Sequence, residues 1–419
     1  MLNPTDRSLH AIIDKVYQGT RLSFQDGLTL YNSHDLPTLG NLANHVRERL
    51  HGSKTYYNIN LHINPTNTCF MNCKFCAFGR KAFNAESYIL TAEQIVERAK
   101  KNLPEGANEI HLVGGLDPRL KLEYYCNYIS ALKAAFPHVH IKTLTPVEVV
   151  FIARMSKLTI GEVIEALHQA GMDSMPGGGA EIFDEDIRNQ ICEHKCDSSG
   201  WFETHRELHK RGLRSNCTML IGHLEEPRHR VDHLLRLRAH QDEWGGVEPD
   251  PQEAADALLA SSSRLERVRE ESRSGATATE SKSEAQRRNG GKQRVRGGFQ
   301  CFIPLSFHPK NTAFSHLPGP SGFDELRNIA VSRLLLDNIP HIKAYWIMLG
   351  IKQAQLAQWF GANDIDGTVA HEEIYHDAGA ETPQGMTVEE LRRIVTDCGR
   401  VPVQRDSLYN EVQLSESLS

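Results

Sequence analysis

The chain contains 419 residues, of which 40% are hydrophobic and 24% are charged, and its formal net charge is -6. This length is sufficient for one large barrel or two domains, and the acidic balance argues against a protein that holds nucleic acid by bulk electrostatics. Nine cysteines without a paired spacing argue against a disulfide framework and favour a reducing compartment. The sequence shows no apolar signal core and no apolar run of membrane-spanning length. We therefore predict a cytoplasmic protein without nucleic-acid or membrane partners.

After residue 58 the sequence alternates between short apolar strands and helices. A repeated βα unit implies a parallel sheet, and eight units imply a closed barrel. The predicted fold class is α/β, a (β/α)8 TIM-type barrel over residues 58–405. An open doubly wound sheet is the alternative, but its G-x-G-x-x-G fingerprint is absent. The eight strand candidates, in chain order, are residues 59–63, 109–113, 139–144, 172–175, 213–221, 299–305, 342–349 and 364–369.

Helices are predicted between these strands from capping residues and apolar periodicity. Thr91 and Thr159 each open a capping box, and Gly171 closes the helix that Thr159 begins. The other predicted helices include residues 124–136, 201–211 and 228–241. Histidines spaced four residues apart on these helices are interpreted as solvated faces, because none has the metalloprotease order H-E-x-x-H: His205/His209 and His229/His233.

Three segments lie outside the repeating pattern. Residues 1–57 are predicted to be a helical extension that packs on the barrel end. Residues 247–296 lack aromatic residues and are rich in Ser, Ala, Glu and Arg, so they cannot bury enough apolar surface to offset their ordering entropy. We predict that they form a disordered, low-complexity insertion within the barrel. Residues 406–419 are predicted to be a frayed tail.

The most informative motif is a cysteine loop directly after the first predicted strand. Cys69, Cys73 and Cys76 have the spacing C-x3-C-x2-C. Three thiolates in one loop can hold three irons of a cubane iron–sulfur cluster and leave the fourth iron open. A zinc site is the alternative, but zinc usually needs a further ligand pair, and none follows at zinc-like spacing.

With Phe75 directly before the third cysteine, this loop resembles that of the radical S-adenosylmethionine enzymes. The resemblance implies a 4Fe-4S cluster on Cys69, Cys73 and Cys76, whose open iron binds S-adenosylmethionine as a co-substrate. It also implies that glycines and carboxylates at later strand ends contact this cofactor. A tight turn or a helix N-terminal acid would explain the same residue types. The cofactor-binding candidates are Phe75, Gly114, Gly115, Glu148, Gly178 and Glu181.

Longer stretches narrow the resemblance to the branch that contains the futalosine enzymes of menaquinone biosynthesis and the deazaflavin synthases, and within it to the aminofutalosine synthases. These stretches are residues 64–78, 174–183, 341–346, 364–369 and 378–380. The implied reaction is radical addition of the 5′-deoxyadenosyl group of S-adenosylmethionine to 3-[(1-carboxyvinyl)oxy]benzoate with decarboxylation. Its implied partners are that small molecule and a one-electron donor such as flavodoxin or ferredoxin. The alternatives are a sister enzyme, such as cyclic dehypoxanthinylfutalosine synthase or a deazaflavin synthase subunit, and a non-catalytic iron–sulfur protein.

A substrate with two carboxylates needs cationic or N–H donors in the cavity. Strand or loop position suggests Lys142 as a donor together with the following candidate substrate contacts: His62, Arg80, Asp117, His223 and Lys343. Asp117 stands where the resemblance leads us to expect histidine. An aspartate there would repel a carboxylate unless it were protonated or directed elsewhere.

Overall fold

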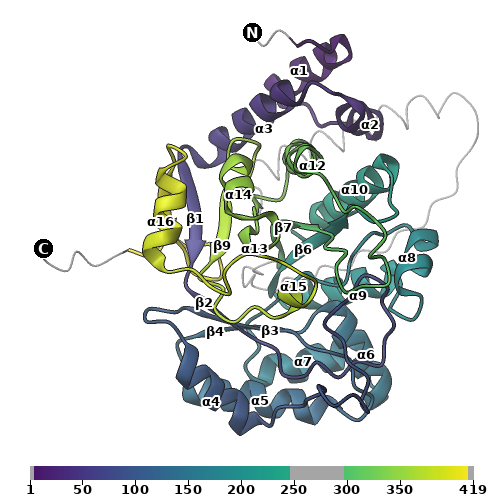
Figure 1. Ribbon diagram of the computed structural model, residues 1–419, viewed down its shortest axis with the longest axis vertical. Coiled ribbons are helices and arrows are strands. Elements are labelled where there is room, and N and C mark those ends of the chain that lie inside the picture. The colour runs from purple at the N-terminus through teal and green to yellow at the C-terminus, as the bar shows by residue number, and fades with distance from the viewer. Residues whose placement is uncertain (1–3, 246–296, 414–419) are drawn as a thin grey trace, which may run out of the picture.

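The computed structural model describes residues 4–245 and 297–413. The predicted insertion at 247–296 therefore lies outside the described residues, as do residues 414–419. Figure 1 shows a sheet of parallel strands surrounded by helices, with a small group of N-terminal helices at one side. Within the described chain, no helix combines the length and the apolar character that a membrane crossing requires.

Seven parallel strands follow one another in chain order around a curled sheet. They are β2 (Asn60–Ile63), β3 (Glu109–Leu112), β4 (His140–Thr143), β5 (Ser174–Met175), β6 (Arg214–Ile221), β7 (Gly298–Ser306) and β8 (His341–Ile342). A second sheet has the order β10-β1-β9 and consists of β10 (Val401–Gln404), β1 (Lys54–Asn58) and β9 (Asp364–Gly367). Single bridges join the sheets, from Lys343 to Asp364 and from Leu61 to Ala370.

The predicted α/β barrel class is therefore confirmed, with one difference where the last strands meet the first. The eighth predicted strand corresponds to β9, which forms its ladder with β1. Its backbone pairing with the barrel neighbours consists of single bridges, at Asp364 and at Ala370 just after the strand. The seventh, predicted over 342–349, is only two residues long. The chain turns after Lys343 into a short helix at 346–349, where the Trp346 indole N–H donates to the carbonyl of Gly367 at 3.0 Å.

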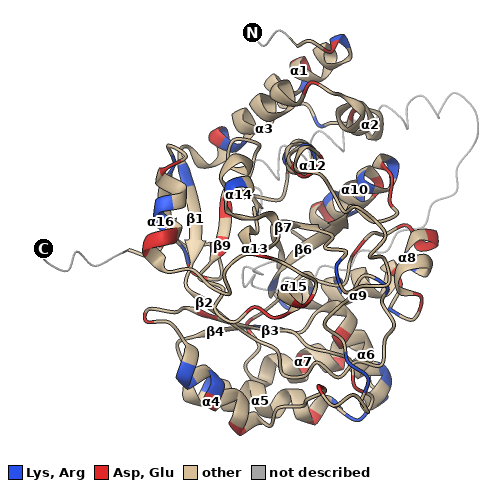
Figure 2. Ribbon diagram, in the orientation of Figure 1, with Lys and Arg blue, Asp and Glu red and all other residues tan. Residues whose placement is uncertain are grey.

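Helices cover the outside of the sheet (Figure 1). Those of the first half are α4 (Ala92–Asn102), α5 (Leu122–Ala135), α6 (Pro146–Ser156), α7 (Ile160–Ala170), α8 (Glu185–Cys192), α9 (Ser198–Lys210) and α10 (Pro227–Trp244). Those of the second half are α12 (Gly322–Leu335), α13 (Trp346–Leu349), α14 (Ile351–Ala357), α15 (Ile374–Asp377) and α16 (Val388–Thr396). The capping boxes at Thr91 and Thr159 and the left-handed Gly171 are present as predicted. Figure 2 shows residues of both charge signs mixed along the outer helices, for example on α10 and α16.

The N-terminal segment contains η1 (Arg7–Leu9), α1 (His10–Tyr17), α2 (Phe24–Asn32) and α3 (Leu36–His51) before β1 begins at Lys54. These helices share the hydrophobic core of the second half of the barrel. The Tyr31 hydroxyl donates to Asn328 Oδ1 of α12 at 2.6 Å, and the space at Gly27 is filled by Val231 of α10. The extension thus covers the outer helices α10 and α12.

Two of the sequence predictions differ from the structure in their burial. His205, His209 and His233 are almost fully buried rather than solvated, because α9 and α10 bring them against β6 and the imidazoles bond to groups inside the fold. The first residues of the tail predicted to fray from residue 406 are packed, whereas Asn410, Glu411 and Gln413 are exposed. The Tyr409 ring stacks on His341 with centroids 3.8 Å apart, and Ser407 is buried.

Candidate active site

A cavity of about 300 Å³ lies at the carboxyl ends of the barrel strands. In a parallel barrel this edge gathers the loops that follow every strand, so residues distant in sequence meet there. All three cysteines of the loop line the cavity, together with the glycine loops after β3 and β5 and inward-facing residues of six strands. The cavity is the place where most of the candidate residues come together.

Backbone hydrogen bonds to neighbouring elements fix the cysteine loop. The amide of Cys69 donates to the carbonyl of Arg80 at 2.7 Å, and the amide of Phe70 donates to the carbonyl of Leu116 at 2.8 Å. Gly79 lies against the thiols: a Cβ added there would be 3.9 Å from Cys69 Sγ and 4.0 Å from Cys76 Sγ. Glycine at position 79 therefore keeps a side chain away from the sulfurs of Cys69 and Cys76.

Two thiols of this loop, Cys69 and Cys73, favour their protonated form in the ligand-free protein. Burial raises the pKa of Cys69 and raises that of Cys73 to about 12. A metal ligand must be a thiolate, so loading would release these protons. Among the described residues, no three His, Cys, Asp or Glu side chains are gathered closely enough to hold a single metal ion. Three cysteine thiolates from one loop are a donor set that a cubane iron–sulfur cluster accepts.

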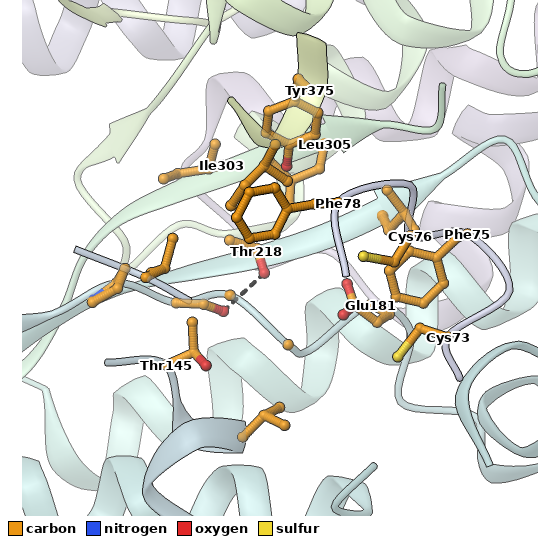
Figure 3. Close-up of a pocket in the computed structure, with 18 of the residues that line it drawn as sticks. Cys73, Phe75, Cys76, Phe78, Thr145, Glu181, Thr218, Ile303, Leu305 and Tyr375 are labelled. Atoms are coloured by element: carbon orange, nitrogen blue, oxygen red, sulfur yellow. Dashed lines mark hydrogen bonds between the residues drawn. The ribbon is translucent and has the colours of Figure 1, made fainter. Parts of the chain in front are cut away.

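Beside the cysteine loop, a buried cation connects two of the predicted cofactor residues. Lys195 donates to Glu181 Oε1, and its ammonium lies 5.1 Å from the centre of the Phe75 ring. Figure 3 shows Glu181 next to Phe75, Cys73 and Cys76. Sequence reasoning missed Lys195, because nothing in its local sequence indicates that the turn after α8 folds back onto the cysteine loop.

The glycines at strand ends allow loops to approach each other closely. A Cβ at Gly115 would lie 2.2 Å from the carbonyl oxygen of Thr68, and one at Gly177 would lie 2.3 Å from that of Asn216. Gly178 also lines the cavity, where its nearest neighbour is the side chain of Thr145. In the structure, these glycines therefore allow the loops to pack closely against each other.

Glu148 also lines the cavity, but its carboxylate serves first as a structural cap. Its Oε2 accepts from the backbone amide and the hydroxyl of Thr145, each at 2.7 Å, and its Oε1 accepts from the amide of Gly114 at 3.0 Å. Burial raises the pKa of Glu148 to about 7. The helix-capping alternative considered for this acid is thus present in the structure.

Charged and imidazole side chains form the deep end of the cavity, on the strands themselves. His62, His111 and Lys142 are register partners on β2, β3 and β4. Lys142 Nζ lies 2.6 Å from Glu109 Oε2, and Lys343 Nζ lies 3.0 Å from Asp366 Oδ2. We call these six side chains the barrel floor: His62, Glu109, His111, Lys142, Lys343 and Asp366.

Sequence reasoning found His62, Lys142 and Lys343 of this floor but missed His111. The available signal was the alternation of strand 109–113, which places Glu109 and His111 on one face. Three of the predicted substrate contacts do not line the cavity. Arg80 holds the cysteine loop through the carbonyls of Ala77 and Phe78, at 2.5 and 3.0 Å.

The other two predicted substrate contacts, Asp117 and His223, interact with neighbouring side chains outside the cavity. The Asp117 carboxylate accepts from Arg119, at 2.9 Å from Nε and 2.5 Å from Nη2, and this contact lowers the pKa of Asp117. His223 is buried beside Glu225, with 3.2 Å between its Nδ1 and the Glu225 carboxylate. The negative charge of Asp117 is therefore neutralised locally and does not face the cavity.

The architecture and the site together define a parallel α/β-barrel protein with a cysteine-lined cavity at the active edge of the barrel. The sequence profile described as the Radical SAM superfamily matches residues 63–238, and that of the CofH/MqnC C-terminal region matches residues 296–418. The chain belongs to the radical SAM superfamily, in the branch whose members carry this C-terminal region, and it is a radical SAM enzyme.

Relatives agree with this assignment over nearly the full length. The aminodeoxyfutalosine synthase of Thermus thermophilus is 40% identical, and the match covers 98% of this chain and 97% of that protein. A 5-amino-6-(D-ribitylamino)uracil–L-tyrosine 4-hydroxyphenyl transferase of Methanothermobacter thermautotrophicus is 36% identical over 90% of both chains. The crystal structure of methylornithine synthase (PylB) shares the fold with a TM-score of 0.66 at 16% identity, covering 93% of this chain and 97% of that one.

Proposed function

We propose that this enzyme is an aminofutalosine synthase, which transfers the 5′-deoxyadenosyl group of S-adenosylmethionine to 3-[(1-carboxyvinyl)oxy]benzoate. One observation carries the proposal: a single cavity extends from the three cysteines to the polar barrel floor. A cofactor at the cysteine end and an acceptor at the floor would thus be neighbours. The choice of acceptor is supported by the 40% identity to the Thermus thermophilus protein over nearly the whole chain.

Cys69, Cys73 and Cys76 are the residues that would hold the 4Fe-4S cluster. The cluster, when bound, supplies the electron that cleaves S-adenosylmethionine. The three cysteines come from one loop, and Gly79 places no side chain against the sulfurs of Cys69 and Cys76. Because the loop offers three thiols, a cluster held by them would have one iron without a cysteine ligand from this loop, which could bind the co-substrate.

Several other residues of the cavity would bind, orient and shield the two substrates. Glu181 and Phe75 lie next to the cysteines and suit the polar and flat parts of S-adenosylmethionine, with Lys195 fixing the Glu181 carboxylate. Ile303, Leu305 and Tyr375 form an apolar wall opposite (Figure 3). An apolar wall excludes water, which would otherwise compete in reactive steps.

The test is an anaerobic assay with the reconstituted cluster, dithionite or a flavodoxin or ferredoxin as electron donor, S-adenosylmethionine and the carboxyvinyloxybenzoate. Mass spectrometry should detect aminofutalosine with the wild type and none with Cys73→Ala. Cys192→Ala is the matched control, since Cys192 is also buried but does not line the cavity. Release of 5′-deoxyadenosine alone would refute adenosyl transfer and favour a sister activity. No cleavage of S-adenosylmethionine by a cluster-loaded enzyme would favour a non-catalytic iron–sulfur protein.

A further inference from the structure

Two histidines of the barrel floor have polar atoms without partners. The rings of His62 and His111 lie 4.5 Å apart, nearly edge to face, on adjacent strands. The Nε2 atom of each ring is buried and makes no hydrogen bond. A buried polar group without a partner costs roughly 1–3 kcal/mol, so such groups usually meet a water or a ligand. Both side chains line the cavity, which makes a bound ligand the available partner.

The cations around these histidines are already paired. Lys142 lies against Glu109 at 2.6 Å, Lys343 lies against Asp366 at 3.0 Å, and Arg405 below them donates to Asp364 at 2.5 Å. A carboxylate that reached the floor would meet these salt bridges with their charges balanced. Among the described floor residues, the unpartnered polar groups are the two imidazoles.

We propose that His62 and His111 form the binding site for one carboxylate of the acceptor, and that the pair takes up one proton from solvent when this carboxylate binds. The inference rests on the proposed function, because it takes the acceptor to be a dicarboxylate. No covalent bond changes in this step. A proton moves onto one imidazole, and the resulting imidazolium donates a charge-assisted hydrogen bond to the carboxylate.

The direction of the proton movement follows from the surroundings. Burial lowers the pKa of His62. Burial and the neighbouring His62 ring lower the pKa of His111 well below its ordinary value. The empty pair is therefore neutral near pH 7. A carboxylate placed between them adds a negative charge, which raises the pKa of an adjacent imidazole. The other charged groups that act on the pair are Asp366, Glu372, Glu109, Lys343 and Lys142. These groups are present whether or not the carboxylate is bound. They therefore do not supply the additional positive charge that the proton brings.

The linked equilibrium predicts that binding weakens as pH rises. If one proton is taken up, the dissociation constant rises up to about tenfold per pH unit once the pH exceeds the pKa of the occupied pair. Replacing either histidine by glutamine retains a hydrogen-bond donor but cannot bind a proton. Loss of a charge-assisted bond should weaken binding by roughly ten- to a hundredfold.

The experiment is calorimetric titration of carboxyvinyloxybenzoate into cluster-loaded, unreduced enzyme with S-adenosylmethionine, so that no turnover occurs. Titrations in buffers of different ionisation enthalpy give the number of protons bound. We expect about one proton for the wild type and none for the double variant His62→Gln/His111→Gln, which has no imidazole left in the pair to take it up. His308→Gln is the matched control, because His308 also lines the cavity but its Nε2 is already 3.0 Å from the carbonyl oxygen of Met348. This variant should retain the proton uptake.

Three results would overturn the inference. These are wild-type binding without proton uptake, unchanged uptake and affinity in the double glutamine variant, and loss of uptake in the His308 control as well. The wild-type measurement alone keeps the inference testable if a variant does not fold, which its melting temperature and S-adenosylmethionine binding would reveal. Aminofutalosine formation by the wild type separates the two proposals: product without proton uptake refutes only the histidine site. Absence of both acceptor binding and product refutes the proposed function and the histidine site together.

Discussion

Substitution of Gly115 by alanine should displace the cysteine loop. An alanine Cβ at this position would lie 2.2 Å from the carbonyl oxygen of Thr68, directly before Cys69, and 2.7 Å from its carbonyl carbon. An ordinary contact needs 3.4–4 Å, so the two backbones must separate by about 1.2–1.8 Å. Metal-ligand distances tolerate only about 0.2 Å. The displacement is therefore several times larger than the cysteine loop can absorb while keeping its ligand geometry.

We expect Gly115→Ala to lose most of its iron after reconstitution and to be destabilised by about 1–3 kcal/mol, which is typical of overpacking. Iron content, the visible absorption of the cluster and a thermal melt measure these effects. Gly114→Ala is the graded control, because a Cβ there would lie 3.0 Å from the carbonyl oxygen of Thr66. It should have the smaller effect on both measurements. Full iron content and an unchanged melting temperature in Gly115→Ala would refute the reasoning that this close contact positions Cys69.

Two further predictions concern buried charges. Lys142→Met should destabilise the fold by about 3–5 kcal/mol in urea unfolding, because it leaves Glu109 charged and buried, and Glu109→Gln in the same chain should recover part of the loss. A double variant no more stable than Lys142→Met would contradict this. Glu148 has a folded pKa of about 7 against an ordinary 4.5, so the folded state binds more protons and stability falls as pH rises from about 4.5 to 7. The upper bound is roughly 3 kcal/mol, and Glu148→Gln should remove this slope from unfolding curves measured across that range. A slope that persists in the variant would assign it to other groups.

Some features of the fold were predictable because their causes are local. The capping boxes at Thr91 and Thr159 depend on contacts within one helical turn, and both are present. The cysteine spacing brings three thiols to one loop whatever surrounds it. The alternation of strands and helices likewise indicated the barrel class, since a parallel strand requires a crossover between itself and the next.

Other features were decided by packing between distant segments. His205 and His209 have the spacing of an exposed helix face, yet they are buried because α9 lies against β6 and α10. Ser215 and His240 bond to the two ring nitrogens of His209, and Ser215 also bonds to Nδ1 of His205. The seventh strand ends early because Trp346 bonds across to Gly367. No local pattern contains these partners, which are between six and 31 residues away in sequence.

The sequence by itself determined the superfamily, the barrel class and the three cysteines, because each depends on short-range spacing or on a repeated unit. Only the tertiary structure placed His111 beside His62 and Lys195 against Glu181. It also showed that Asp117 is neutralised by Arg119 outside the cavity. Strand register and loop docking decide these contacts, and both are set by the packing of the whole barrel rather than by the residues next to each site.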